Sequence, residues 1–314
     1  MDLISDILSR MRLAGTLYFR TSFTSPWSIK VPQFENVARF HFAHRGGCFI
    51  RVDGEAEPVL LEQGDLIIIT RGTSHTLYCD PTTENIAVLL DTVIEDSGFT
   101  GSGTLIYGEP GTNQETQLVC GHFAFDKNTN HPLIDALPSY IHIKDYGEPA
   151  GRWMESTLKV IGAEAGREQL GGDLIALKLS EIIFAQALRT YLGSDGVDKP
   201  VLAGFSDRNI SMALSAFHKN PIFRWTLGDL AKIAGMSRTS FATKFARLVC
   251  MTPGEYITHW RMQIARQVLT ESNAPIIEIA ENAGYQSEAA FSRVFKKHFN
   301  YPPATYRREL QRST

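Results

Sequence analysis

Residues 230–245 read LAKIAGMSRTSFATKF, and residues 279–295 repeat their pattern as IAENAGYQSEAAFSRVF. Gly235 recurs 49 positions later as Gly284, and five other residues recur unchanged at a spacing of 50: Ser237, Phe241, Phe245, Pro253 and Tyr256. One residue is therefore inserted after the second glycine. Internal repetition is the first organising signal to look for in a chain. Each copy predicts a helix, a turn at the glycine and a second helix.

The second helix of each copy is expected to have one buried face and one open face. Ser237 and Ser287 are expected N-caps, because a serine hydroxyl can accept a hydrogen bond from a backbone N–H of the first turn. Phenylalanines four residues apart share a face and predict the buried side. The open faces then carry Arg238, Thr239, Ala242 and Thr243 in the first copy, and Glu288, Ala289, Ser292 and Arg293 in the second, with Lys296 close by.

Charge is divided unevenly along the chain. Residues 207–314 hold 15 Lys and Arg against 8 Asp and Glu, whereas the other residues hold 16 against 26. The net charge of −3 therefore combines a basic helical region with an acidic remainder. A basic region suits a polyanion, and an acidic region does not.

These features together predict a reader of double-stranded DNA. A recognition helix enters the major groove, roughly 12 Å wide, and presents small or hydrogen-bonding residues near its N-terminus. Two such helices on one rigid connector would lie about one DNA turn apart, roughly 34 Å. Two alternatives use the same helices without DNA: an ordinary bundle with a solvated basic face, or an interaction module with a structural role. The paired repeat and the basic excess favour DNA.

Residues 207–314 resemble the DNA-binding domain of AraC/XylS-type transcription regulators. The most specific stretch is residues 284–296, GYQSEAAFSRVFK, with Pro303, Tyr306 and Arg307 behind it. The resemblance implies a sequence-specific transcription regulator that contacts two successive major grooves through the two open faces. Ala242 and Thr243 have short side chains, so we expect less base contact from the first reader, or apolar contact to thymine methyl groups.

Residues 15–143 contain short runs of Val, Ile, Phe and Thr between Gly, Pro and Asp turns. Asp53-Gly54 between two such runs predicts a hairpin, and short strands at this spacing are typical of a sandwich or barrel. The stretch from His41 to His75 resembles the small β-barrel of cupin-like sensor domains in the same regulators. The predicted fold class is α+β: a cupin-like β-barrel with flanking helices, then an all-α domain with two helix-turn-helix motifs.

The interior of such a barrel can hold a small effector. The candidate effector contacts are His41, Arg51, Arg71, His75 and Cys120. The two arginines would favour an anionic effector if they point inward, although such arginines more often lie on the barrel surface. The sequence leaves the identity of the effector open.

The alternative interpretation is a metal-dependent cupin enzyme with a DNA-binding tail. His41, His75, Cys120 and His122 are residues of the types that suit zinc. However, Ala43 stands where a second inward histidine would be expected after His41, and His44 would face the other side of a regular strand. This incomplete set favours hydrogen-bonded pocket residues, with no metal, no other cofactor and no enzymatic activity.

With 314 residues, the chain is long enough to form two domains with separate cores. We expect a sensor domain over residues 1–148, a helical segment over 149–193, a linker over 194–206 and the double helix-turn-helix domain over 207–314. Apolar residues recur at helical spacing through residues 174–192. This segment is therefore expected to brace the barrel and to pair two protomers in a homodimer. RNA polymerase is a further possible partner of such a regulator.

The expected compartment is the cytoplasm, with no membrane partner. No apolar run approaches the roughly 20 residues of a membrane span, and residues 1–12 lack the apolar core of a signal peptide. The four cysteines form no CxxC pair, so no disulfide framework is predicted.

Overall fold

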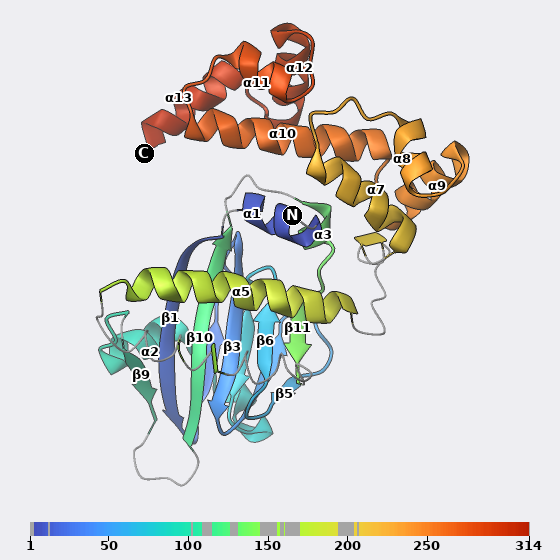
Figure 1. The fold of residues 1–314 in the computed structure, drawn as a ribbon. Coiled ribbons are helices and arrows are strands. Elements are labelled where there is room, and N and C mark those ends of the chain that lie inside the picture. Colours follow the sequence, from blue (N-terminus) through green and yellow to red (C-terminus); the bar gives the residue numbers. More distant parts are fainter. Residues whose placement is uncertain are drawn as a thin grey trace. The chain divides into compact units, whose positions relative to one another are not determined.

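The structure is a computed structural model that describes residues 3–11, 13–101, 103–108, 115–125, 131–144, 156–157, 160, 170–193, 204–205 and 207–313 (Figure 1). The chain forms two units, each described by itself below. The barrel unit contains residues 12–128 and 137–194, and the helical unit contains residues 1–11, 129–136 and 195–314. The predicted linker lies outside the described residues except for 204–205, as does most of the predicted helical segment before residue 170.

Two β-sheets pack face to face in the barrel unit. The six-stranded sheet has the order β11-β6-β3-β10-β1-β9, and the five-stranded sheet has the order β5-β4-β7-β2-β8. The strands are β1 (Leu13–Thr24), β2 (Ser28–Val31), β3 (Val37–Arg45), β4 (Cys48–Val52), β5 (Val59–Leu61), β6 (Leu66–Ile69), β7 (His75–Tyr78), β8 (Val88–Leu89), β9 (Thr104–Tyr107), β10 (Glu115–Phe125) and β11 (Tyr140–Ile143). Apolar residues from both sheets fill the space between them.

Strand β4 illustrates how the sequence builds this sandwich. Its burial alternates, so that Cys48, Ile50 and Val52 point into the core, as the two-residue period of a strand requires. Gly54 takes a φ of +91° in the turn that follows, a conformation that favours glycine. Ile50 then pairs with Val59 of β5, which confirms the hairpin predicted at Asp53-Gly54.

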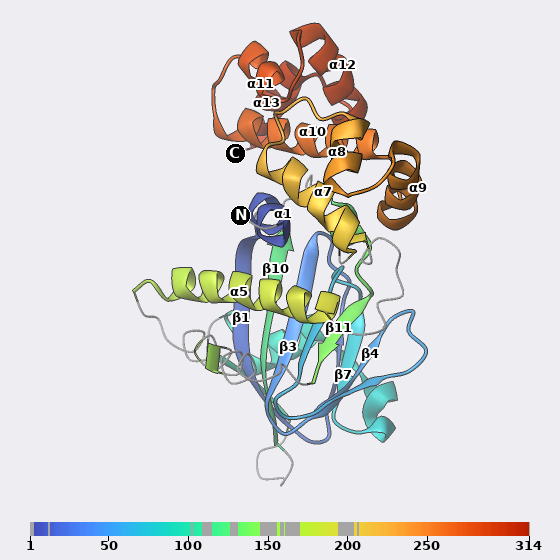
Figure 2. The same cartoon turned by 45° about the vertical axis from the view of Figure 1, so that its right-hand side comes forward.

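Helix α5 (Gly172–Gly193) covers the outer face of the six-stranded sheet (Figures 1 and 2). Phe184 packs its ring against Phe123 and Phe125 of β10, with centroid distances of 5.2 and 5.7 Å. The same helix exposes Leu174 and Ile182 to solvent. Two shorter elements complete the unit: η1 (Pro81–Ile86) and α2 (Leu90–Ser97).

The helical unit contains the two predicted helix-turn-helix copies. Its helices are α1 (Leu3–Met11), α3 (Pro132–Asp135), α7 (Arg208–Lys219), α8 (Leu227–Ile233), α9 (Arg238–Val249), α10 (Pro253–Glu271), α11 (Ile276–Asn282), α12 (Glu288–Phe299) and α13 (Pro303–Ser313). In each copy the glycine turn has a positive φ, +65° at Gly235 and +82° at Gly284. The caps are confirmed, since Ser237 accepts a hydrogen bond from the Ser240 N–H, and Ser287 from the Ala290 N–H.

A buried hydrogen-bonded chain connects α1, α7, α10 and the segment that contains α3. The His131 Nδ1 accepts from the Leu133 N–H, and burial lowers the pKa of His131. His131 is therefore neutral, and its Nε2 donates to the Tyr256 hydroxyl at 3.1 Å. That hydroxyl donates to His218 Nε2 at 2.7 Å, and His218 Nδ1 donates to an Asp6 carboxylate oxygen at 2.6 Å. These hydrogen bonds thus hold α1 and the α3 segment against α7 and α10.

Candidate functional site

The predicted DNA-reading residues lie on the surfaces of α9 and α12. The buried faces of these helices hold the repeated phenylalanines, which are no more than 1% exposed: Phe241, Phe245, Phe291 and Phe295. Ala242 and Ser292 are half-buried, and the other predicted readers are exposed: Arg238, Thr239, Thr243, Glu288, Ala289, Arg293 and Lys296. Both faces are therefore accessible to solvent in the unit described, as contact with a groove requires.

The two arginines of these faces are placed differently. Arg238 begins α9 and lies over α8, where a Cβ atom added to Gly228 would come within 3.0 Å of the Arg238 Nε. Arg293 lies one turn inside α12, and its Nε makes a long hydrogen bond of 3.4 Å to the Ala289 carbonyl. Neither guanidinium is enclosed by the helical unit, so both are available to phosphates or base edges.

Arg261 on the connecting helix α10 fixes the first copy against the second. Its Nε and Nη2 donate to the carbonyls of Pro221 and Phe223, each at 2.8 Å. A Cβ atom added to Gly284 would lie only 2.9 Å from the Arg261 Nη1. The guanidinium is therefore held between the loop before α8 and the turn between α11 and α12. This contact connects the two copies through α10.

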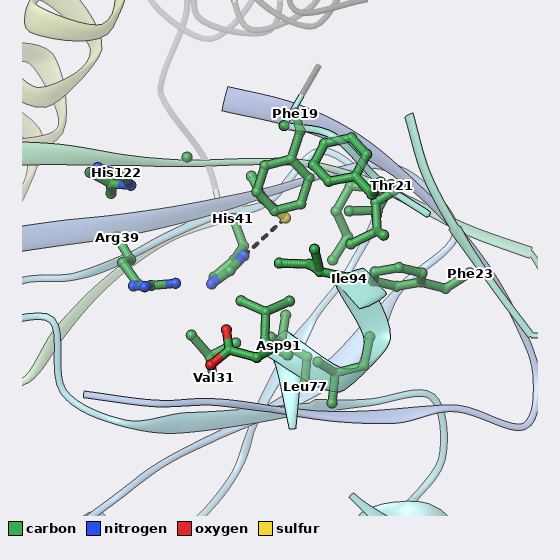
Figure 3. A pocket seen from close by; sticks show the side chains of 18 of the residues that line it. Phe19, Thr21, Phe23, Val31, Arg39, His41, Leu77, Asp91, Ile94 and His122 are labelled. Atoms are coloured by element: carbon green, nitrogen blue, oxygen red, sulfur yellow. Dashed lines mark hydrogen bonds between the residues drawn. The ribbon is translucent and has the colours of Figure 1, made fainter. Parts of the chain in front are cut away.

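The barrel unit contains a partly open cavity of about 430 Å³ between its two sheets. Its lining is mainly apolar and comes from both sheets and from α2: Phe19, Phe23, Ile29, Val31, Phe34, Leu77, Leu90, Ile94, Phe99, Leu105 and Leu118. Polar side chains gather at one end, as Figure 3 shows for Arg39, His41, His122 and Asp91. The volume falls within the roughly 300–1,000 Å³ of small-molecule sites.

Three of the predicted effector contacts form one neutral hydrogen-bonded chain. His75 Nδ1 donates to the Thr73 carbonyl at 2.9 Å, and burial lowers the pKa of His75 to about 4. His75 is therefore neutral, and its Nε2 accepts from His41 Nε2 at 2.9 Å. His41 Nδ1 must then accept from the Cys120 thiol at 3.1 Å. Burial raises the pKa of Cys120 and lowers that of His41, which keeps the chain uncharged.

Comparison with known proteins assigns the family. The cupin family matches residues 2–193, and the helix-turn-helix domain family matches residues 230–309. A protein of Streptomyces lividans described as an AraC-like transcription regulator is 30% identical to this chain, with 98% of each chain covered. The chain belongs to the AraC-like transcription regulators.

The chain is also similar to a second regulator and to a solved DNA-binding structure. The HTH-type transcriptional regulator AlkR of Acinetobacter baylyi is 29% identical to this AraC-like regulator over 98% of this chain and 100% of its own. A crystal structure of an AraC-type DNA-binding protein from Chromobacterium violaceum is 27% identical and covers 33% of this chain and 94% of its own, with a TM-score of 0.32. The predicted fold class, with its cupin-like barrel and its helix-turn-helix region, is confirmed.

Three of the predicted effector contacts of this AraC-like regulator do not line the cavity: Arg51, Arg71 and His75, which bonds to the lining residue His41. Arg51 binds Glu84 through two hydrogen bonds and also donates to the Ala56 carbonyl at 3.0 Å. Arg71 donates to the Leu137 carbonyl at 2.7 Å. Arginine is long and fully charged, so its position in the sequence does not reveal which polar partner it reaches.

The cavity instead contains a charged residue that the sequence reading did not select. Arg39 lies two residues before His41 on β3, and it pairs directly with His122 of β10. Residues two apart on a strand share a face, so the same period that places His41 inward also places Arg39 inward. The sequence therefore contained a usable signal for Arg39.

The hydrogen-bonded arrangement of His75, His41 and Cys120 does not fit a metal centre. His41 uses its two ring nitrogens toward different partners, Cys120 on one side and His75 on the other. One ion cannot bind both nitrogens of a single imidazole. Among the described residues, no group of three or more His, Cys, Asp or Glu side chains is arranged to hold a metal.

Within the described part of the chain, no helix is both long and apolar enough to cross a bilayer.

Proposed function

We propose that this AraC-like regulator binds a small effector in the barrel cavity and that the effector controls sequence-specific DNA binding. The observation that carries the proposal is the 430 Å³ cavity, lined mainly by apolar side chains with polar groups at one end. A cavity of this kind suits a small molecule better than a macromolecule. The chemistry at the polar end is hydrogen bonding, and we assign no enzymatic activity to it.

The continuity of the chain supplies a route from the cavity to the DNA-binding helices. Strand β1 carries the cavity residues Phe19 and Phe23, and it begins at Leu13, two residues after α1 ends at Met11. Strand β10 carries Cys120 and ends at Phe125, shortly before the segment that contains α3. Both flanking segments are held in the helical unit by the buried chain at Tyr256. We propose that the effect of a bound effector passes along these two strands to the helical unit.

The control mechanism is a population shift between arrangements of the protein. An effector changes DNA affinity only if it binds one arrangement more tightly than another. We propose that the DNA-competent arrangement presents two reading faces to successive major grooves. The proposed readers are Arg238, Thr239, Ala242 and Thr243 on α9, and Glu288, Ala289, Ser292, Arg293 and Lys296 on α12.

The proposal includes a homodimer that forms through the exposed apolar residues of α5. Leu174 and Ile182 are 61% and 45% exposed, and large exposed apolar side chains that gather on one surface mark interaction sites. We also propose the four functional regions expected from the sequence: a sensor domain (1–148), a helical segment (149–193), a linker (194–206) and a DNA-binding domain (207–314). DNA binding further implies action in the cytoplasm, with RNA polymerase as a potential partner during activation.

The dimer is tested by the mass of the protein in solution. We expect the double substitution of Leu174 and Ile182 by serine to reduce the sedimentation mass from a dimer to a monomer. Replacing exposed Ile106, on β9, by serine is the matched control and should leave the mass unchanged. A monomeric wild-type protein at micromolar concentration would contradict the dimer.

The central test is a gel shift with the upstream region of the regulator's own gene. The full chain should bind this DNA more tightly than an unrelated duplex of equal length. A library of small molecules is then added, and a compound that changes the affinity for this DNA should also raise the thermal stability of the protein without DNA. Equal affinity for both duplexes would contradict sequence-specific binding.

A further inference from the structure

The barrel cavity is divided into a charged end and an apolar end. Figure 3 shows Arg39, His122 and Asp91 together on one side, and Phe23, Leu77 and Ile94 away from them. A ligand that fills the whole cavity must therefore carry a polar head and an apolar body. The question is which head group the charged end selects.

Arg39 is the unsatisfied donor at this end. Its Nε atom is buried and has no hydrogen-bond partner among the described residues. Its guanidinium carbon lies 4.1 Å from the centroid of the Phe34 ring, and this cation–π contact holds the guanidinium plane in place. A buried N–H without a partner is costly, so an acceptor atom on a ligand would remove a penalty that the empty site carries.

The neighbouring groups favour an anion as that acceptor. His41 already uses both ring nitrogens within the barrel. Burial, with the positive charge of Arg39, lowers the pKa of His122, so its neutral ring can offer one N–H beside the guanidinium. Asp91 attracts Arg39 electrostatically, but Asp91 is exposed, so water weakens this attraction. The guanidinium therefore gives the enclosed part of this end a positive character, and a guanidinium fork matches a carboxylate closely.

We infer that the effector is an amphipathic monoanion, a carboxylic acid whose carboxylate binds Arg39 and His122 and whose hydrocarbon or aromatic body fills the apolar end. This inference rests on the proposed function, because it names the ligand class of the same cavity. The volume of about 430 Å³ has room for roughly 14 water-sized groups. Medium-length acids therefore fit within this volume.

The test compares three probes that differ only in their head group: decanoic acid, 1-decanol and decylamine. Each is titrated into the full-length protein by calorimetry, without DNA, at neutral pH and below the concentration of micelle formation. The titrations are repeated with Arg39→Gln and with Arg45→Gln. Arg45 is the matched control because it lies on the same strand, is 68% exposed at its side chain and does not line the cavity.

The wild-type protein should bind the acid roughly 10- to 100-fold more tightly than the alcohol, as expected for charge-assisted hydrogen bonds. Arg39→Gln should reduce the affinity for the acid to about that of the alcohol and leave the alcohol unchanged. Arg45→Gln should change neither. Unchanged binding of the alcohol to Arg39→Gln shows that the variant barrel is folded.

Three results would overturn the inference: equal binding of acid and alcohol, tighter binding of the amine, or binding of none of the probes. Equal binding or a preference for the amine would leave an effector cavity with a different ligand class. The DNA affinity of the same protein preparations, measured without probes, separates these results from a failure of the DNA-binding function.

Discussion

Arg293 is the residue whose role in sequence recognition can be tested most simply. It is exposed one turn inside α12, and an arginine there can bind a guanine edge through two hydrogen bonds. We expect Arg293→Ala to weaken binding to the preferred site by about 1–3 kcal/mol and to relax base choice at one position. Binding to a set of single-base variants of the site measures both effects.

Lys219→Ala is the control for this substitution. Lys219 is exposed at the end of α7, outside both reading helices, so its loss should leave base choice unchanged. If Arg293→Ala instead weakened all sequences by the same factor, Arg293 would be a phosphate contact.

Tyr256 and Tyr306 are equivalent in the repeat but differ in their partners. The Tyr256 hydroxyl is bonded to two buried histidines, whereas the buried Tyr306 hydroxyl has no partner among the described residues. Tyr256→Phe removes the hydroxyl that bonds to a ring nitrogen of each buried histidine and should cost about 1–3 kcal/mol of unfolding free energy. Tyr306→Phe should cost much less. Urea denaturation of both variants measures the difference, and equal costs would argue against the buried chain.

His75 gives the barrel a predicted dependence on pH. Burial lowers its pKa to about 4 in the folded state, below the roughly 6.5 of an exposed histidine. Between these values the unfolded chain binds more protons than the folded chain. The free energy of unfolding is therefore highest above pH 6.5 and falls as the pH decreases toward 4.

Thermal unfolding of the wild-type protein and of His75→Asn across this pH range checks the expectation. The wild-type transition should fall more steeply with decreasing pH, because the variant lacks this titrating ring. Parallel curves would mean that His75 contributes nothing to the pH dependence. Other buried histidines, including His131, shift in the same direction, so only the difference between the two curves is informative.

At the scale of single residues, the sequence predicted roles more reliably for repeated positions than for isolated ones. The caps at Ser237 and Ser287 could be predicted because each occupies a fixed place in a copied pattern. The connections of Arg51 and Arg71 could not, since a long side chain selects its partner from the whole fold. The position of Arg39 on the inward face could have been predicted from the two-residue period of the strand, but Arg39 belongs to no motif that would have drawn attention to it.

At the scale of elements, the two glycine turns make a matched pair with different surroundings. Both have a positive φ, which costs a residue with a Cβ atom about 1 kcal/mol or more. A Cβ on Gly235 would meet open space, whereas a Cβ on Gly284 would press against the guanidinium of Arg261. We therefore expect Gly284→Ala to reduce the free energy of unfolding by about 2 kcal/mol or more, and Gly235→Ala by about 1 kcal/mol.

Gly284→Ala should also weaken specific DNA binding beyond its effect on stability. Displacing Arg261 loosens its bonds to the carbonyls of Pro221 and Phe223, and these bonds help to set the spacing of the two readers. Binding measured well below the unfolding temperature separates the two effects. Equal DNA affinities of the two alanine variants would mean that Arg261 does not set this spacing.

The elements whose packing could not be predicted from the sequence are those that depend on distant partners. The repeat predicted the helix-turn-helix copies because their signals are local. The α1 and α3 segments belong to the same unit as the C-terminal helices. No signal in the sequence near these two segments indicates this. Their placement follows from the buried bonds of His218 and Tyr256, which join residues up to 212 positions apart.

At the scale of the whole molecule, the uneven charge separates the tasks of the two regions. The basic excess lies in residues 207–314, and the acidic excess lies in the rest of the chain. Long-range attraction to DNA therefore acts on the reading helices, and the remainder of the chain is repelled from the same polyanion. The charge predicts which region binds DNA, but base preferences depend on the side chains of α9 and α12.

Selection of preferred sites from a random DNA library by the full-length protein tests the central claim most directly. We predict that the enriched sequences contain two blocks of base preference whose centres lie about 10 base pairs apart, one turn of the duplex. Arg293→Ala should weaken the preference in one block and leave the other intact. Enrichment of a single block, or of no sequence at all, would contradict two tandem readers on one face of the DNA.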